Sequence, residues 1–169
     1  MTRILILCFF LLTDKTTVYL APLSPLPSLP VAVISDVVSF AYEIYNVLVG
    51  ESIDSVMAEI IVAQAVLESG NFGSNLAKKH NNFFGMMHPH IRPTTSLGPW
   101  AKAEGRRGYA SYCSVKESTL DLILWLRYNK IGTICTTYSY SRTLKKYGYF
   151  GSNVEDYRRG LNFYKKRKF

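Results

Sequence analysis

The chain has 169 residues, which is enough for one globular domain with a real core and too few for two. Hydrophobic residues make up 48% and charged residues 19%, a composition that excludes a disordered chain. The net charge is +8 and the basic excess lies after residue 70, so we expect an anionic partner: a cell envelope, a membrane surface or nucleic acid.

The first 30 residues predict an export signal followed by a linker. Arg3 and the apolar run 4–12 have the order of a signal peptide, so we expect residues 1–21 to be one, with the cut after Ala21. The apolar run is well short of the roughly 20 residues that span a bilayer, and no stable transmembrane anchor is expected. Residues 22–30 contain four prolines and predict an extended linker, which places the folded domain at 31–169.

Apolar periodicity and helix breakers predict an α-dominated domain. The five expected helices cover residues 37–48, 53–69, 74–79, 117–129 and 154–165. Between the third and the fourth helix, residues 86–112 contain Pro, Gly, Thr and Ser among short apolar pieces. This composition predicts loops with at most a small hairpin.

The helix expected at 53–69 ends on a glutamate. Its apolar stripe continues at the same spacing to Gln64, Leu67 and Glu68, and Gly70 follows as a helix stop. Desolvation and the negative end of the helix dipole both disfavour a carboxylate there, so they raise the pKa of Glu68 and suit it to donate a proton. The spacing alone leaves a second interpretation open, in which Glu68 turns to solvent at a frayed helix end.

Two runs of sequence help to decide between the buried and the solvent-facing interpretation of Glu68. They read AQAVLESGNFGSNLA at 63–77 and NNFFGM at 81–86. Together they resemble the glucosaminidase family of peptidoglycan hydrolases, whose flagellar and autolysin members carry AQ-x-x-LESG-x-G-x-S-x-LA followed by NN-x-FG. The resemblance includes the gap between the two runs and favours Glu68 as the catalytic acid.

Further matches follow in chain order and extend the resemblance over about residues 53–162. Residues 112–118 are similar to the family's Y-x-S-x-x-ES, in which Ser114 is the expected cap of the next helix and Glu117 completes a capping box. Residues 148–150 with Tyr157 resemble the stretch before the last helix. Two departures stand out: the family's arginine before Y-x-S is missing, and Gly-Ser-Asn at 151–153 replaces T-D-P.

The resemblance implies a lysozyme-like, α-dominated α+β fold with a helical lobe and a small flexible β-hairpin lobe over the cleft. It implies an endo-β-N-acetylglucosaminidase that cleaves the β-1,4 bond on the reducing side of N-acetylglucosamine in peptidoglycan. Lytic transglycosylase cleavage on the same fold, or a non-catalytic basic module that binds cell wall or nucleic acid, are the alternatives. The expected substrate contacts are Gln64, Asn82, Phe84, Trp100, Tyr112 and Tyr149.

A second carboxylate has one candidate, because Glu104 is the only acidic residue between Glu68 and Glu117. An inverting glycosidase holds its base about 6.5–9.5 Å from the acid, with a water between them. Neighbouring arginines would lower the pKa of Glu104 and keep it charged, as a base requires. Alternatively the substrate's own 2-acetamido oxygen attacks, or Glu104 only pairs with Arg106 or Arg107 on the surface.

The remaining candidate residues predict little further chemistry. His88 and His90 flank a proline without a third ligand, so neither a metal nor a cofactor is expected. We expect Trp125 to be buried in its helix, and Cys113 and Cys135 to be buried thiols whose pairing the sequence leaves open. The protein is expected to be an exported monomer of the periplasm or cell envelope that acts on glycan strands and not on nucleic acid; a phage lysis protein would share these residues.

Overall fold

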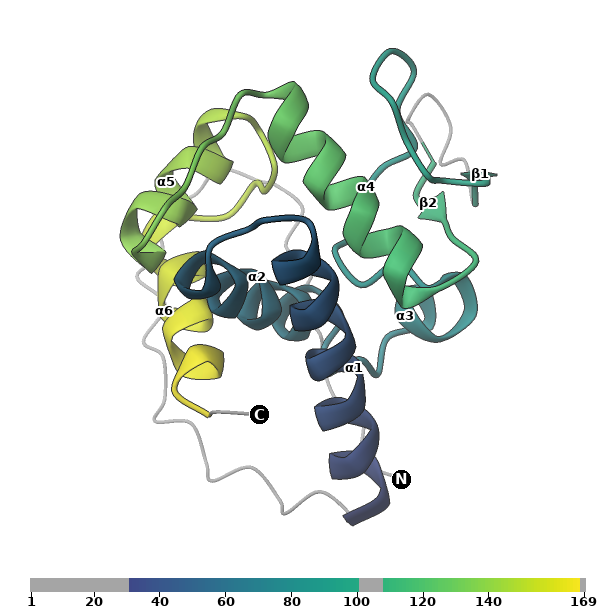
Figure 1. The fold of residues 1–169 in the computed structure, drawn as a ribbon, viewed down its shortest axis with the longest axis horizontal. Helices are drawn as coiled ribbons and strands as arrows, with labels where there is room; N and C mark the ends of the chain where they lie inside the picture. Colours follow the sequence, from purple (N-terminus) through teal and green to yellow (C-terminus); the bar gives the residue numbers. More distant parts are fainter. Residues whose placement is uncertain (1–30, 101–107, 168–169) are drawn as a thin grey trace, which may run out of the picture.

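The computed structural model describes residues 31–100 and 108–167. Within these ranges the chain forms mostly helices, with one two-stranded antiparallel sheet (Figure 1). The elements are α1 (Val31–Gly50), α2 (Ser55–Glu68), α3 (Asn75–His80), β1 (Gly98–Pro99), β2 (Ala110–Ser111), α4 (Val115–Tyr128), α5 (Thr137–Lys146) and α6 (Val154–Lys165). The predicted α-dominated α+β class is confirmed.

Helix α2 lies in the middle of the helical part of the molecule (Figure 1). It packs against α1 and α6, while α4 packs on α1 and α5 packs on α6. The small sheet lies at the other end of the molecule from α5 and α6, beyond α3 and α4 (Figure 1). The described part of the chain contains no helix that is both long and apolar enough to cross a membrane.

Helix α2 is buried on nearly every side. The Asp54 side chain caps its first turn by accepting hydrogen bonds from the backbone N–H groups of Val56 and Met57. Residues 57, 58 and 60–66 are all buried, so the apolar surface is wider than the single stripe that the sequence predicts. A helix that is apolar all round is a core helix. Each fully buried Ile or Val contributes about 1.5–3 kcal/mol relative to an exposed one, so α2 forms a rigid base for its last residue.

The end of α2 is fixed by local hydrogen bonds. The Ser69 hydroxyl donates to the carbonyl of Ala65 at 2.6 Å and accepts from the N–H of Phe72 at 2.9 Å. Gly70 follows with a φ of +59°, a left-handed conformation that glycine adopts without steric cost and that ends the helix, as predicted. The chain therefore turns away immediately after Glu68.

Helix α5 (Thr137–Lys146) was not predicted, although it carries helix signals. Thr136 caps it by accepting from the N–H of Ser139 at 3.1 Å. The buried positions 137, 140, 141 and 144 have helical spacing, and two lysines lie in the last turn. Two of these four buried positions are Thr and Ser, which hides the apolar stripe in the sequence.

The other helices agree with the prediction in number and place. Helix α1 begins six residues earlier than the predicted 37–48, α3 is shifted by one residue, and α6 has the predicted bounds. Helix α4 begins at Val115, directly after Ser114, whose hydroxyl accepts from the N–H of Glu117 at 3.2 Å. The predicted Ser114 cap is confirmed.

The described part of residues 86–112, which we call the lobe, forms the small hairpin that the sequence predicts. Gly98 pairs with Ser111 and Pro99 with Ala110, and an isolated bridge joins Met87 to Tyr109. The lobe is attached to α4 through a buried ion pair, in which both guanidinium nitrogens of Arg92 lie 2.8 Å from the carboxylate oxygens of Asp121. The Tyr112 hydroxyl donates to the same carboxylate at 2.7 Å.

The two cysteines of the described residues lie at the surface. Cys113 and Cys135 are exposed free thiols, so the prediction of buried thiols was wrong. Both lie just before a helix cap, Cys113 before Ser114 and Cys135 before Thr136, where the chain runs over the surface.

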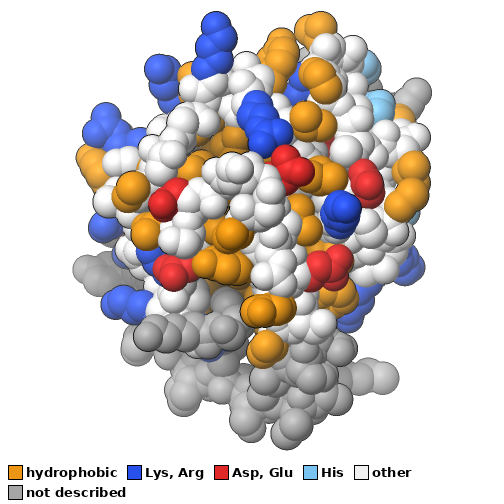
Figure 2. Space-filling view, viewed as in Figure 1, with side chains coloured by type: hydrophobic (Ala, Val, Ile, Leu, Met, Phe, Trp, Pro, Cys, Tyr) orange, Lys and Arg blue, Asp and Glu red, His pale blue; other side chains and the backbone are white. Residues whose placement is uncertain are grey.

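On the face shown in Figure 2, lysines and arginines are spread out and interspersed with carboxylates. The basic side chains on this face are therefore not gathered into one patch.

Candidate active site

Glu68 is the last residue of α2 and is half-buried. Its Oε1 accepts a hydrogen bond from the Tyr157 hydroxyl of α6 at 2.7 Å. The Tyr157 ring is itself held by Phe150, which stacks on it with the ring centroids 3.9 Å apart and an angle of 9° between the planes. Glu68 does not turn to solvent, and the frayed-end interpretation is excluded.

The surroundings of Glu68 raise its pKa above the ordinary 4.5. Burial is the main cause, because a desolvated carboxylate is disfavoured in its charged form. The hydrogen bond from Tyr157 acts in the opposite direction and lowers the pKa, but by less. The C-terminal end of α2 adds a negative helix dipole. Glu68 thus keeps a proton at a higher pH than a surface glutamate does, as the sequence predicts.

Three tyrosines surround the acid with inward-facing hydroxyls. Tyr140 donates to Oε1 of Gln64 at 2.5 Å, Tyr149 donates to the carbonyl of Phe84 at 2.5 Å, and Tyr157 donates to Glu68. Burial, followed by the charge of Glu68, raises the pKa of all three hydroxyls above 10. They therefore remain neutral hydrogen-bond donors. The sequence identified Tyr149 as a site residue and missed Tyr140 and the role of Tyr157.

Gln64 lies one turn before Glu68 on α2 and is fully buried. Its carbonyl oxygen accepts from Tyr140, whereas its Nε2 has no hydrogen-bond partner among the described residues. Gln64 lies beside the acid, but its enclosed side chain does not reach the surface, so the structure does not show the substrate contact that the sequence predicts. Because the side chain is enclosed, its Nε2 is a hydrogen-bond donor that lies in the interior of the site and not at the surface.

The Asn-Asn-Phe-Phe-Gly run at 81–85 places its own backbone beside the Glu68 carboxyl group. The Asn82 amide is buried, donates to the carbonyls of Met86 and Ala110 at 2.8 Å each, and accepts from the N–H of Met86 at 2.9 Å. These bonds fix the turn that contains Gly85, which has a φ of +62°. A β-carbon at position 85 would lie 3.6 Å from Oε2 of Glu68, so this turn lines the carboxylate.

Three of the expected substrate contacts have another role in the structure. Asn82, Phe84 and Tyr112 are at most 3% exposed, and the polar side-chain atoms of Asn82 and Tyr112 bond within the protein. Tyr112 serves the Arg92–Asp121 anchor, which excludes its hydroxyl from the cleft. We assign these residues to the framework that holds the lobe, because enclosed side chains cannot touch a polymer.

The two tryptophans differ from each other as predicted, but by less than expected. Trp100 is 41% exposed on the lobe and packs against the ring of His80 with the centroids 4.0 Å apart, and its contact with a sugar stays a prediction. Trp125 is only half-buried, so the prediction that it is buried was wrong. Helix α4 is apolar on one side, and Trp125 lies at the border of that side, against Tyr147 and Tyr149.

Among the described residues, the remaining candidates place no further functional group beside Glu68. Glu104 lies outside the described residues, so its role stays a prediction. His88 bonds through Nδ1 to the Ser96 hydroxyl at 3.0 Å. Residues 31–100 and 108–167 contain no group of three or more His, Cys, Asp or Glu side chains that could hold a metal ion.

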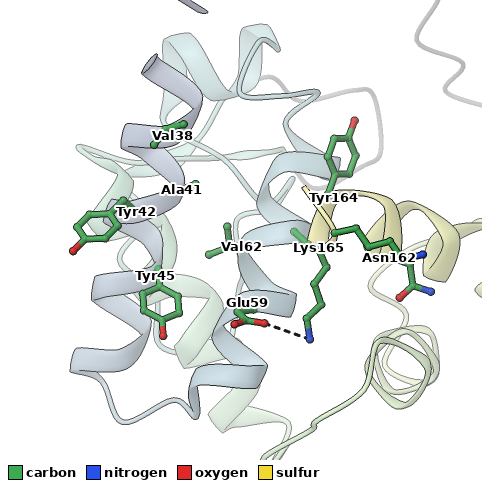
Figure 3. A pocket seen from close by; sticks show the side chains of 11 residues that line it. Val38, Ala41, Tyr42, Tyr45, Glu59, Val62, Asn162, Tyr164 and Lys165 are labelled. Carbon is green, nitrogen blue, oxygen red and sulfur yellow. Dashed lines mark ion pairs between the residues drawn. The ribbon is translucent and has the colours of Figure 1, made fainter. Parts of the chain in front are cut away.

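A separate cavity of about 660 Å³ lies between α1, α2 and α6 (Figure 3). Its lining includes Tyr42, Tyr45 and Tyr164, and Lys165 pairs with Glu59 across it at 3.5 Å. Glu68 is not among the lining residues. The carboxylate geometry, and not this cavity, therefore locates the candidate chemistry.

Residues 50–168 match the family described as mannosyl-glycoprotein endo-beta-N-acetylglucosaminidase. The chain belongs to the glucosaminidase family. The family is one of glycoside hydrolases, as the sequence predicts. The match begins before α2 and includes Glu68, Gly85 and Tyr157. A comparison with curated proteins finds no matching sequence.

Three solved structures share the fold. A type VI secretion system effector-immunity complex from Pseudomonas protegens contains a chain with a TM-score of 0.63 and 14% identity, over 82% of this chain and 94% of that one. The catalytic domain of the autolysin Auto from Listeria monocytogenes gives 0.53 and 18%, over 85% and 88%. A peptidoglycan hydrolase from Sphingomonas sp. A1 gives 0.55 and 20%, over 80% and 91%. These matches confirm the expected lysozyme-like fold.

Proposed function

We propose that this protein is an endo-β-N-acetylglucosaminidase of peptidoglycan, with Glu68 as the general acid. The observation that carries the proposal is the position of Glu68: a desolvated carboxyl at the end of the core helix, bonded to a neutral Tyr157. Glycosidases need one carboxyl group that stays protonated until it meets the leaving oxygen. Family membership supports N-acetylglucosamine as the sugar on the cleaved bond.

In the proposed reaction, Glu68 donates its proton to the glycosidic oxygen as the bond to the anomeric carbon breaks. The carboxylate that forms keeps its hydrogen bond from Tyr157, which stabilises it until a proton returns. General acid catalysis of this kind contributes typically 10²- to 10⁴-fold to the rate. Tyr149 and Tyr140 fix the surrounding walls through Phe84 and Gln64.

The nucleophile is the second part of the proposal. Between Glu68 and Glu117 the sequence holds a single acidic residue, Glu104, and Asp121 is engaged with Arg92. Either Glu104 activates a water, which inverts the anomeric configuration, or the substrate's 2-acetamido oxygen attacks, which retains it. Proton NMR of freshly formed product distinguishes these routes by the anomer that appears first.

The substitution Glu68→Gln tests the proposal. We expect sacculus digestion to fall by about 10²- to 10⁴-fold, because the amide cannot donate the proton. Glu59→Gln is the matched control, since Glu59 lies on the same helix, is exposed and faces Lys165. Mass spectrometry of the digest should show new reducing N-acetylglucosamine ends. Anhydro-sugar ends would instead indicate a lytic transglycosylase, and full activity of the Glu68→Gln protein would overturn the role of Glu68.

We also propose that the protein acts outside the inner membrane, in the periplasm or cell envelope. The support is the substrate class together with the predicted signal at 1–21 and the basic excess after residue 70. Eighteen lysines and arginines against five carboxylates favour approach to an anionic wall. A monomer is expected to suffice, because Glu68 and the tyrosines around it come from one chain.

A further inference from the structure

An aromatic cluster continues outward from the acid and is not explained by the chemistry at Glu68. It consists of Trp125 on α4 and Tyr147 and Tyr149 after α5. The Trp125 ring meets Tyr149 at a centroid distance of 5.2 Å and an angle of 70°, and Tyr147 at 6.3 Å and 84°. We call these three residues the aromatic step.

The aromatic step is continuous with the active site. The Tyr149 hydroxyl bonds to the carbonyl of Phe84, the residue before Gly85, and Gly85 lines the Glu68 carboxylate. Exposure rises along this series of contacts, since Tyr149 and Trp125 are half-buried and Tyr147 is 40% exposed. Tyr140, by contrast, is fully enclosed in the core. This series of rings instead reaches the surface.

The chemistry of the aromatic step suits a sugar. Flat aromatic faces pack against the apolar C–H faces of pyranose rings, and a nearby cation can meet an anionic substituent. The Lys146 ammonium lies 5.6 Å from the Tyr147 ring centroid, and so adds a positive charge beside the exposed ring. Muramyl lactyl groups and stem peptides of the wall bring carboxylates on alternate sugars.

We infer that Trp125 and Tyr147 form a saccharide subsite that takes a sugar of the glycan strand next to the cleaved bond. The inference rests on the proposed function, because it extends the cleft of Glu68. It assigns binding and not chemistry to Trp125 and Tyr147, since Tyr149 is the ring of the aromatic step that bonds to the backbone beside the acid. Removing the exposed ring should therefore weaken affinity for glycan and leave the cleavage step unchanged.

The test uses the Glu68→Gln protein labelled with 5-fluorotryptophan, because the chain has only two tryptophans. Fluorine NMR then gives one resonance each for Trp100 and Trp125, assigned with Trp100→Phe. Soluble oligosaccharides of alternating N-acetylglucosamine and N-acetylmuramic acid are titrated at increasing length. We expect a saturable shift of the Trp125 resonance, and its absence while the oligosaccharide binds would overturn the inference.

The variant Tyr147→Ala gives a second, independent measurement. We expect its dissociation constant for the same oligosaccharides to rise on the order of 3- to 10-fold, the range of one aromatic contact. In the active chain the KM should rise by the same factor while kcat is unchanged. Tyr138→Ala is the control, since Tyr138 is an exposed tyrosine of α5 that packs against Arg142.

The outcomes separate the two proposals. An unchanged dissociation constant for Tyr147→Ala, with Glu68→Gln inactive, overturns the saccharide subsite and leaves the proposed function standing. A Glu68→Gln protein that still cleaves the wall overturns the proposed function, whatever the Trp125 resonance shows. A raised KM with a lowered kcat would place the aromatic step in the chemical step and would also overturn the inference.

Discussion

Glu68 and Asp121 are both shielded from solvent, but their pKa values shift in opposite directions. Among the described residues Glu68 has a single hydroxyl donor, Tyr157, and burial raises its pKa. Asp121 is fully buried, and burial alone would raise its pKa as well. Hydrogen bonds from Arg92 and Tyr112, among others, and the charge of Arg92 outweigh that effect and hold the pKa of Asp121 below its ordinary value.

The comparison shows that the partners, and not burial itself, decide what a buried carboxyl can do. Asp121 is kept ionised by a guanidinium and so serves as an anchor for the lobe. Glu68 meets the neutral Tyr157 hydroxyl instead and so keeps an exchangeable proton. A cation placed beside Glu68 would lower its pKa and keep it ionised, as Arg92 does for Asp121.

The largest expected effect comes from breaking the anchor. Arg92→Met leaves the Asp121 carboxylate buried without its cation, and should lower the free energy of unfolding by about 3–5 kcal/mol. Arg127→Met is the control, because Arg127 and Glu51 form an exposed ion pair worth about 0–1 kcal/mol. Urea unfolding at neutral pH measures both. Equal losses in the two variants would show that the buried pair does not hold the lobe.

The pH dependence of stability distinguishes the two carboxyls further. Because the folded pKa of Glu68 is raised, the unfolded chain releases this proton first as pH rises, and folding is penalised from the ordinary pKa of 4.5 up to the raised one. Glu68→Gln removes this penalty. We expect its advantage in free energy of unfolding to grow by up to about 1.4 kcal/mol per pH unit within that window and then to stay constant.

Denaturant unfolding of both proteins from pH 4 to pH 9 measures this difference. Parallel stability curves would contradict a raised pKa at Glu68. Asp121 has the opposite sign, since its contribution is present above its ordinary pKa of 3.8 and is lost as pH falls through the lowered one. Asp121 therefore contributes to an acid loss below pH 3.8 that both proteins share, and Glu68 to a loss above pH 4.5 that only the chain with Glu68 shows.

The smallest expected effect comes from Tyr157→Phe. Its hydroxyl stabilises the Glu68 carboxylate, so its removal should raise the pKa of Glu68 further and move the alkaline limb of kcat/KM to higher pH. The change in kcat at the optimum should be about ten-fold or less, as for one lost hydrogen bond. In Tyr149→Phe the limb should stay in place, since that hydroxyl serves Phe84; a limb that moves in neither variant would contradict the assignment.

Local patterns in the sequence were sufficient to place Glu68 at the end of its helix, and the family resemblance was needed to choose between its two orientations. The helical spacing from Ile60 to Glu68, followed by Gly70, predicts a glutamate at the buried end of a helix, and the structure confirms this position. The Ser114 cap was predictable for the same reason, because it depends on residues only three positions apart. The small hairpin of the lobe followed from composition alone, since its pairs, such as Gly98 and Ser111, are more than ten positions apart.

The surroundings of the acid could not be predicted in this way. Tyr157 is 89 positions from Glu68, and Tyr140 is 76 positions from Gln64, so no local pattern records these contacts. Tyr140 also lies on α5, whose buried Thr and Ser positions conceal the helical stripe. The half-burial of Trp125 depends on the packing of two tyrosines after α5, which are likewise distant in sequence.

Gly85 has a consequence for the direction in which the proton leaves. Oε1 of Glu68 accepts from Tyr157, so the protonated form carries its hydrogen on Oε2, the oxygen that faces Gly85. The left-handed backbone at Gly85 is strained for any other residue, and a β-carbon there would lie 3.6 Å from that oxygen. In the proposed reaction the two oxygens therefore have separate tasks: Oε1 keeps the hydrogen bond from Tyr157, and Oε2 carries the proton.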